Sequence, residues 1–135
     1  MQRWLTMSAA ALGRAIAKGD IDPVDLAQTF LDAIDAHPFT SRIYTIVTHD
    51  RALAEARAAS ERARLGQQKS ALDGVPVSWK DLFDSAHVAT EAGSVLLEKS
   101  YTAQRLRGAA LRDGVGVGLP RENASVRIGL LWFGL

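Results

Sequence analysis

The sequence predicts an α/β fold, because stretches with helical periodicity alternate with short β-branched segments bounded by glycine and proline. Helices are expected at Ser8–Lys18, at Val24–Ala36 and from Asp50 to about Leu65. Short strands are expected at Arg42–Val47 and Gly74–Trp79. The 135 residues give room for one domain, and the hydrophobic fraction of 47% is typical of a folded chain.

The two N-terminal helices have clear boundary signals. Gly19 follows the first helix as a C′ residue, and Asp22 supplies an N-cap for the second. Pro23 then takes the first helical position, where its missing N–H costs nothing. His37-Pro38 ends the second helix. Apolar residues recur in the second helix at three- and four-residue steps: Ala27, Phe30, Leu31 and Ile34. This spacing predicts an amphipathic helix that packs on a larger body.

The third helix and the second strand have weaker signals. We expect Asp50 to cap this helix and Gly66 to follow its end. The helix is rich in Ala, Arg and Glu, which predicts a surface helix with one alanine-lined face. The strand is entered through Gly74, and Pro76 is unfavourable in a central strand.

Charge and composition exclude several classes of partner and site. Sixteen Lys and Arg against fifteen Asp and Glu give a formal charge of +1, so we expect no direct contact with nucleic acid or an anionic membrane. The chain has no cysteine, and its three histidines (His37, His49 and His87) lack metal-ligand spacing. We therefore expect neither metal nor cofactor. No window approaches the ~18 apolar residues of a membrane span, and we expect a cytoplasmic chain.

Lys80 carries the main chemical prediction. It follows the apolar run Val75–Val77, with Trp79 beside it, which predicts a lysine at the end of a strand next to the core. Desolvation lowers the pKa of a lysine, and a neutral amine can take a proton from a hydroxyl and so activate a serine nucleophile. The alternative from the residues alone is an exposed Lys80 that pairs with Asp81 or Asp84.

The surrounding motif resembles a known family. Leu72–Asp81 (LDGVPVSWKD) resembles the lysine motif of the amidase signature family, in which Gly-(Ile/Val)-Pro-(Ile/Val) is followed by two variable residues and Lys-Asp. Thr90–Ser94 (TEAGS) is similar to the Thr-Thr-Ala-Gly-Ser element that comes next, with Glu91 in place of threonine. The order of the preceding helices and strand is also similar, so the resemblance covers about residues 7–100.

The resemblance implies a fold, a reaction and one site residue. The fold is a mixed sheet flanked by helices, of which residues 1–100 would supply the N-terminal helices and first strands. The reaction is hydrolysis of a small-molecule amide through a Ser–cis-Ser–Lys triad. Only the lysine maps onto this sequence, at Lys80, because both serines belong to a later Gly/Ser-rich segment that this sequence does not contain.

We therefore expect a truncated amidase-family chain that is inactive alone. Two alternatives remain open. The first is a protein like the A subunit of an amidotransferase, which works in a complex. The second is a small, non-catalytic helical interaction module, with Trp132-Phe133 available to dock on a partner.

Residues 101–135 differ from the rest of the chain. All five of their basic residues are arginine, they hold six of the eleven glycines, and they show no helical or strand period of useful length. In a frame displaced by one base, family elements that follow the lysine motif can be spelled in order. They are Gly-Lys-Thr from Arg121–Asn123, Glu-Leu from Arg127-Ile128, and Ser-Gly-Leu-Gly from Leu131–Leu135. We therefore interpret residues 101–135 as an out-of-frame or disordered tail after a frameshift near residues 99–104.

Overall fold

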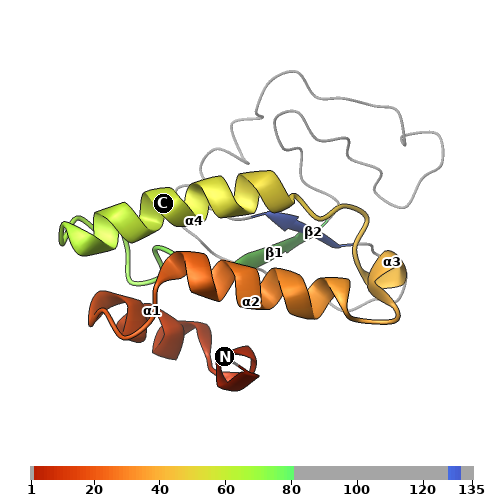
Figure 1. Ribbon diagram of the computed structural model, residues 1–135, viewed down its shortest axis with the longest axis horizontal. Coiled ribbons are helices and arrows are strands. Elements are labelled where there is room, and N and C mark those ends of the chain that lie inside the picture. The colour runs from red at the N-terminus through yellow and green to blue at the C-terminus, as the bar shows by residue number, and fades with distance from the viewer. Residues whose placement is uncertain (1, 81–127, 132–135) are drawn as a thin grey trace.

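The computed structural model describes residues 2–80 and 128–131, which form a set of helices beside two paired strands (Figure 1). The three helices expected from the sequence are confirmed in type and position. The described residues form a two-stranded antiparallel sheet, and the mixed sheet expected from the family resemblance stays a prediction. In chain order the elements are η1 (Gln2–Thr6), α1 (Ala9–Ala17), α2 (Pro23–Asp35), α3 (Thr40–Ile43), α4 (His49–Arg64), β1 (Val77–Lys80) and β2 (Ile128–Leu131).

Local hydrogen bonds explain where the first two long helices begin. The Ser8 hydroxyl accepts a bond from the N–H of Ala11 at the start of α1, and Asp22 Oδ1 accepts one from Val24 N–H at 2.7 Å at the start of α2. These side chains satisfy N–H groups that have no partner within the helix. Gly19 follows α1 with a φ of 77°, a left-handed conformation that glycine adopts without strain.

The start of α4 differs from the expectation. Thr48 is its N-cap residue and makes no capping hydrogen bond from its side chain, while Asp50 lies one residue inside the first turn. A carboxylate in the first turn still interacts favourably with the positive end of the helix dipole. Asp50 therefore stabilises the start of α4, although it is not the N-cap. Gly66 follows the helix with a φ of 66°, as expected.

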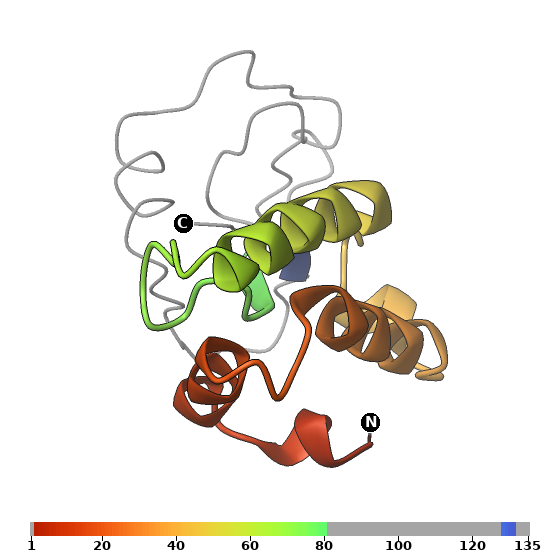
Figure 2. The same ribbon diagram turned by 60° about the vertical axis from the view of Figure 1, so that its left-hand side comes forward.

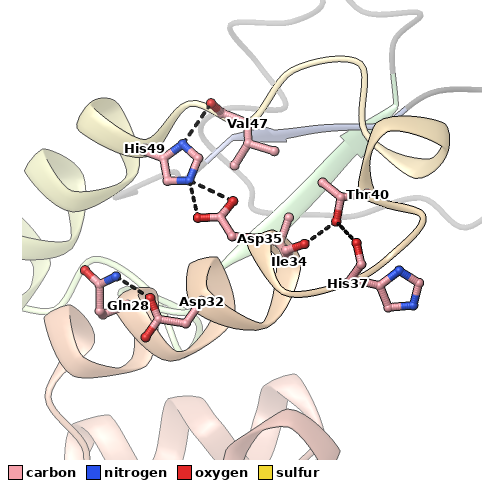
Figure 3. A network of polar contacts seen from close by, with 8 residues as sticks. All are labelled: Gln28, Asp32, Ile34, Asp35, His37, Thr40, Val47 and His49. Atoms are coloured by element: carbon pink, nitrogen blue, oxygen red, sulfur yellow. Dashed lines mark hydrogen bonds and ion pairs between the residues drawn. The ribbon is translucent and has the colours of Figure 1, made fainter.

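Helices α2 and α4 run antiparallel (Figure 1), and side-chain contacts join them at both ends. At one end Ser60 Oγ donates to Asp22 Oδ2 at 2.6 Å. At the other, His49 Nε2 lies 3.0 Å from Asp35 Oδ2 (Figure 3). Between them the predicted alanine-lined face of α4 is buried, with no exposed surface on Ala52 and Ala56. Small side chains there allow two helices to approach closely.

A second apolar cluster joins α1 and α2 to the turn that precedes β1. Figure 2 shows α1 below α4 and next to the start of α2. Five buried residues form this cluster: Leu12, Ile16, Ile21, Leu26 and Val75. Val75 follows directly on the turn and leads into β1, which we call the lysine strand because it ends at Lys80. The start of the lysine strand is therefore anchored in the helical core.

The first predicted strand, at Arg42–Val47, is wrong. Arg42 and Ile43 belong to the single turn of α3, and of the remaining residues only Val47 forms a strand-like bridge. The Thr40 hydroxyl donates to the carbonyls of Ile34 and His37, which holds the chain in a turn directly after α2 (Figure 3). Local side-chain bonding therefore overrides the β propensity of this segment.

The second predicted strand is confirmed, with a shift of its start. Gly74 lies in the preceding turn with a φ of 91°, Pro76 comes before the first paired residue, and β1 runs from Val77. Strand β1 pairs antiparallel with β2, with Val77 opposite Leu131 and Lys80 opposite Ile128.

Strand β2 lies where the sequence predicts no strand. Four residues are too few to show a period, and the hydrogen-bonding partner that makes them a strand comes from β1, far away in sequence. Residues 81–127 and 132–135 lie outside the described residues, as does the Thr90–Ser94 motif.

Candidate active site

Lys80 is the last residue of β1, which agrees with its predicted position at a strand end. Its Cα lies opposite that of Ile128 in the neighbouring strand. The catalytic function of Lys80 stays a prediction. Asp81 and Asp84, its alternative partners, lie outside the described residues.

The turn before β1 is held by a buried ion pair. The Asp73 carboxylate has no exposed surface, and Arg62 of α4 binds both of its oxygens. Nε of Arg62 donates to Oδ2 at 2.8 Å, and Nη2 donates to Oδ1 at 2.6 Å. The backbone N–H of Lys69 adds a third bond to Oδ2 at 3.1 Å. The Asp73 carboxylate therefore links α4 to the segment from Lys69 to Asp73 that leads into β1.

The surroundings of this carboxylate favour its charged form. Burial raises the pKa of Asp73, but the hydrogen bonds from Arg62 and from the Lys69 backbone, with the nearby positive charges, outweigh burial and hold that pKa below its ordinary value. In return, the bond to Asp73 raises the pKa of the Arg62 guanidinium. The two side chains are thus a charged pair at neutral pH.

Two glycines allow the same turn to lie close to the helices. A Cβ on Gly13 in α1 would come within 2.0 Å of the Ala71 carbonyl oxygen, a distance that no real contact has. A Cβ on Gly74 would lie 2.9 Å from Cγ of Pro23, at the start of α2. The turn is therefore fixed by contact with α1 and α2 as well as by the ion pair with α4.

Lys80 and its motif can be identified from the sequence, but Arg62, Gly13 and the structural function of Asp73 within the motif cannot. One available signal was Asp73 itself, an ionisable residue directly before the apolar run Val75–Val77. A residue of this kind is seldom buried without a partner. Its partner could not be chosen from sequence, because α4 and the following loop contain several cationic residues.

Other features of the described residues are separate from the lysine motif. A cavity of about 420 Å³ opens between the end of α1, the start of α2 and the end of α4, and no residue of the motif lines it.

Within residues 2–80 and 128–131 there is no cluster of His, Asp and Glu that could hold a metal ion. None of the helices described there is long and apolar enough to cross a membrane.

Comparison with known proteins agrees with the resemblance seen in the motif. Residues 25–105 match the model of the family described as Amidase. The A subunit of glutamyl-tRNA(Gln) amidotransferase from Thermobifida fusca is 38% identical over 117 residues, which cover 82% of this chain and 24% of that protein. The protein of the same name from Chloroflexus aurantiacus is 43% identical over 93 residues, covering 69% of this chain and 19% of that protein.

A solved structure is similar in both sequence and fold. It is described as "An unexpected vestigial protein complex reveals the evolutionary origins of an s-triazine catabolic enzyme". One of its chains matches with a TM-score of 0.73 and 28% identity, over 92% of this chain and 26% of its own. This chain thus spans about a quarter or less of the proteins it matches. The family match, the two relatives and the shared fold together show that the chain belongs to the amidase family.

Proposed function

We propose that Lys80 is the general base of an amidase centre that hydrolyses the C–N bond of a small-molecule carboxamide in the cytoplasm, without metal or cofactor. The observation that carries the proposal is the placement of the lysine motif. Leu72–Asp81 lies within the matched range 25–105, and its described part forms the anchored turn and the strand that ends at Lys80.

The chemistry assigned to this centre follows from the triad. A neutral lysine amine takes a proton from a bridging serine, which takes one from the nucleophilic serine as that oxygen attacks the amide carbonyl. Backbone N–H groups stabilise the oxyanion of the tetrahedral intermediate. The leaving nitrogen then receives a proton, and water hydrolyses the acyl-enzyme to the carboxylic acid and the free serine.

We propose that the 135-residue chain does not catalyse this reaction by itself. The Gly/Ser-rich segment that supplies both serines is absent from its sequence. Loss of members of such a triad lowers the rate by many orders of magnitude, because its residues act as a unit.

We also propose that residues 101–135 are translated out of frame. The family match ends at residue 105, directly after the interval 99–104, and displaced-frame elements of the family follow in order. The sequence of the encoding DNA tests this proposal directly.

The first experiment is to sequence the encoding DNA from about codon 95 to several hundred bases past the stop and to translate all frames. A displaced frame that continues through Gly-Lys-Thr and Ser-Gly-x-Gly into a Gly/Ser-rich segment supports the proposal. That frame is then restored by a single-base change, and the enzyme is assayed for ammonia release from a set of carboxamides. Activity that Lys80→Ala abolishes supports the assignment of Lys80, and activity that survives the substitution overturns it.

A second candidate function is favoured by the curated relatives, which share the name of the glutamyl-tRNA(Gln) amidotransferase A subunit. In this candidate the restored protein works on an amide as one component of a complex. Co-purification of the tagged, restored protein with stoichiometric partners, and amidase activity that depends on them, would favour it. A non-catalytic interaction module is the remaining alternative. It predicts one stoichiometric partner of the 135-residue chain that is lost when residues 101–135 are deleted.

A further inference from the structure

We infer that Arg62 is a positioning residue for the lysine strand: by holding both oxygens of Asp73, it fixes the turn before β1 and thereby the place of Lys80. The catalytic meaning of this inference rests on the proposed function of Lys80. The positioning itself is a property of α4, the turn and β1, so it can be tested in the chain as it exists.

The geometry of the pair suits it to fixing an orientation. Arginine presents a rigid, planar fork, and two parallel hydrogen bonds to one carboxylate define a direction as well as a distance. Asp73 uses both oxygens in this way at 2.6 and 2.8 Å, and its side chain is closed off from solvent. Val77, the first residue of β1, lies four positions further along the chain. Little backbone freedom remains between the fixed carboxylate and the strand.

Helix α4 is a rigid support for this fork. Its alanines Ala52 and Ala56 are buried against α2, and Ser60, two residues before Arg62, is bonded to Asp22 at the start of α2. The position of the guanidinium is therefore set by the packing of the two long helices. A displacement of the turn relative to α2 would break the hydrogen bonds of Arg62.

Apolar packing alone does not supply the same constraint. Val75 anchors the turn in the second apolar cluster, but hydrophobic contacts are non-directional and tolerate small rotations. The close approaches at Gly13 and Gly74 prevent the turn from moving inward, toward α1 and α2. The ion pair prevents it from moving away, because that would leave a buried carboxylate without partners.

The test uses the 135-residue chain, three variants that are compared with it, and a fourth that assigns one NMR signal. Asp73→Asn keeps the shape of the side chain and removes its charge, and Arg62→Lys keeps a charge and removes the fork. Glu61→Gln is the matched control, because it breaks an exposed ion pair with Arg64 on the same helix. Hydrogen–deuterium exchange is measured for peptides from residues 69–80, α2 and α4. In parallel, NMR of isotopically methylated lysines reports on the Lys80 amine, with its signal assigned by Lys80→Arg.

Positioning by the pair predicts a local effect. In Asp73→Asn and Arg62→Lys, exchange in residues 69–80 should increase about tenfold more than in α2 and α4, and the Lys80 signal should shift. The Glu61→Gln variant should leave both readouts unchanged. An equal increase in all three regions would show that the pair only adds global stability, and it would overturn the inference. An unchanged Lys80 signal in both pair variants would overturn it as well.

The two proposals fail in different experiments. If Lys80→Ala leaves the restored enzyme active, the proposed function is wrong, and the exchange and NMR results on positioning still stand. If the exchange increase is global, the inference about Arg62 is wrong, and the assignment of Lys80 as the base is unaffected.

Discussion

Arg62 and Asp73 form a two-point ion pair that connects the last turn of α4 with the turn before β1. Both carboxylate oxygens accept hydrogen bonds from the guanidinium, at 2.6 and 2.8 Å, and the carboxylate has no exposed surface. Of the ion pairs in the described part of the chain, this one has the least exposed acidic partner. It is also the pair whose loss has the largest expected consequences.

The first prediction concerns acid pH. The folded-state pKa of Asp73 lies below its ordinary value of 3.8, so the pair contributes fully to the free energy of unfolding above about pH 5. That contribution is lost as the pH falls through the lowered folded-state value. Urea unfolding between about pH 6 and pH 3 should therefore show a falling midpoint for the wild type and a smaller fall for Asp73→Asn. If the urea midpoint falls equally with pH in the wild type and in Asp73→Asn, the prediction is wrong.

The same variant should be less stable at neutral pH. Asp73→Asn leaves the partly buried Arg62 without a charged partner, and we expect a loss of about 2 kcal/mol in the free energy of unfolding. The side chain of Arg62 is 19% exposed and can regain some water, which keeps the loss below that of a fully buried pair. Glu61→Gln, in the exposed pair on the same helix, should change the free energy of unfolding far less than Asp73→Asn does.

The second prediction is that Gly13→Ala destabilises the chain. In an unconstrained helix this substitution stabilises by about 1 kcal/mol, because alanine has the higher helix propensity. Here the new Cβ would meet the Ala71 carbonyl oxygen at 2.0 Å, so α1 and the turn must separate. We expect a net loss of about 2 kcal/mol or more by urea unfolding. A stabilised Gly13→Ala variant would show that the turn does not lie against α1.

The third prediction tests the packing of α2 against α4. Ala56→Leu adds volume where the side chain has no exposed surface, and overpacking of this kind costs about 1–3 kcal/mol. Ala58→Leu is the matched control on the exposed face of the same helix, and it should change stability by less than about 0.5 kcal/mol. Thermal unfolding of both variants measures the difference. Equal effects would argue against the α2–α4 interface.

The fourth prediction concerns the start of α2. Asp22 caps the helix through Val24 N–H and also accepts a bond from Ser60 of α4. Asp22→Ala removes both bonds and should cost about 1–2 kcal/mol, whereas Asp22→Asn keeps an acceptor for the cap and should cost less. Ser60→Ala removes only the contact between helices. If Asp22→Ala and Ser60→Ala have equal effects on the urea midpoint, the cap contributes nothing.

The end of α1 and the start of α2 are predictable from the sequence because their causes are local. Asp22 and Gly19 act within a few residues of their own position, and the structure places both as expected. The strand predicted at Arg42–Val47 is wrong, and the cause is again local. Its β-branched residues favour a strand, but the Thr40 hydroxyl bonds to carbonyls at the end of α2, and the chain turns instead. Short segments depend on such neighbours more than on propensity.

The sequence by itself determined the helices α1, α2 and α4 of this protein, the lysine motif and the family to which the motif belongs. These depend on periodicity, capping residues and the order of side chains along the chain, which can all be seen without coordinates. Tertiary structure alone decided three contacts: Arg62 with Asp73, Gly13 against Ala71, and the pairing of β1 with β2. Each joins residues from different elements, and their partners are selected by how the helices pack, because a sequence offers many residues of suitable charge or size and only the packed chain brings one of them within reach.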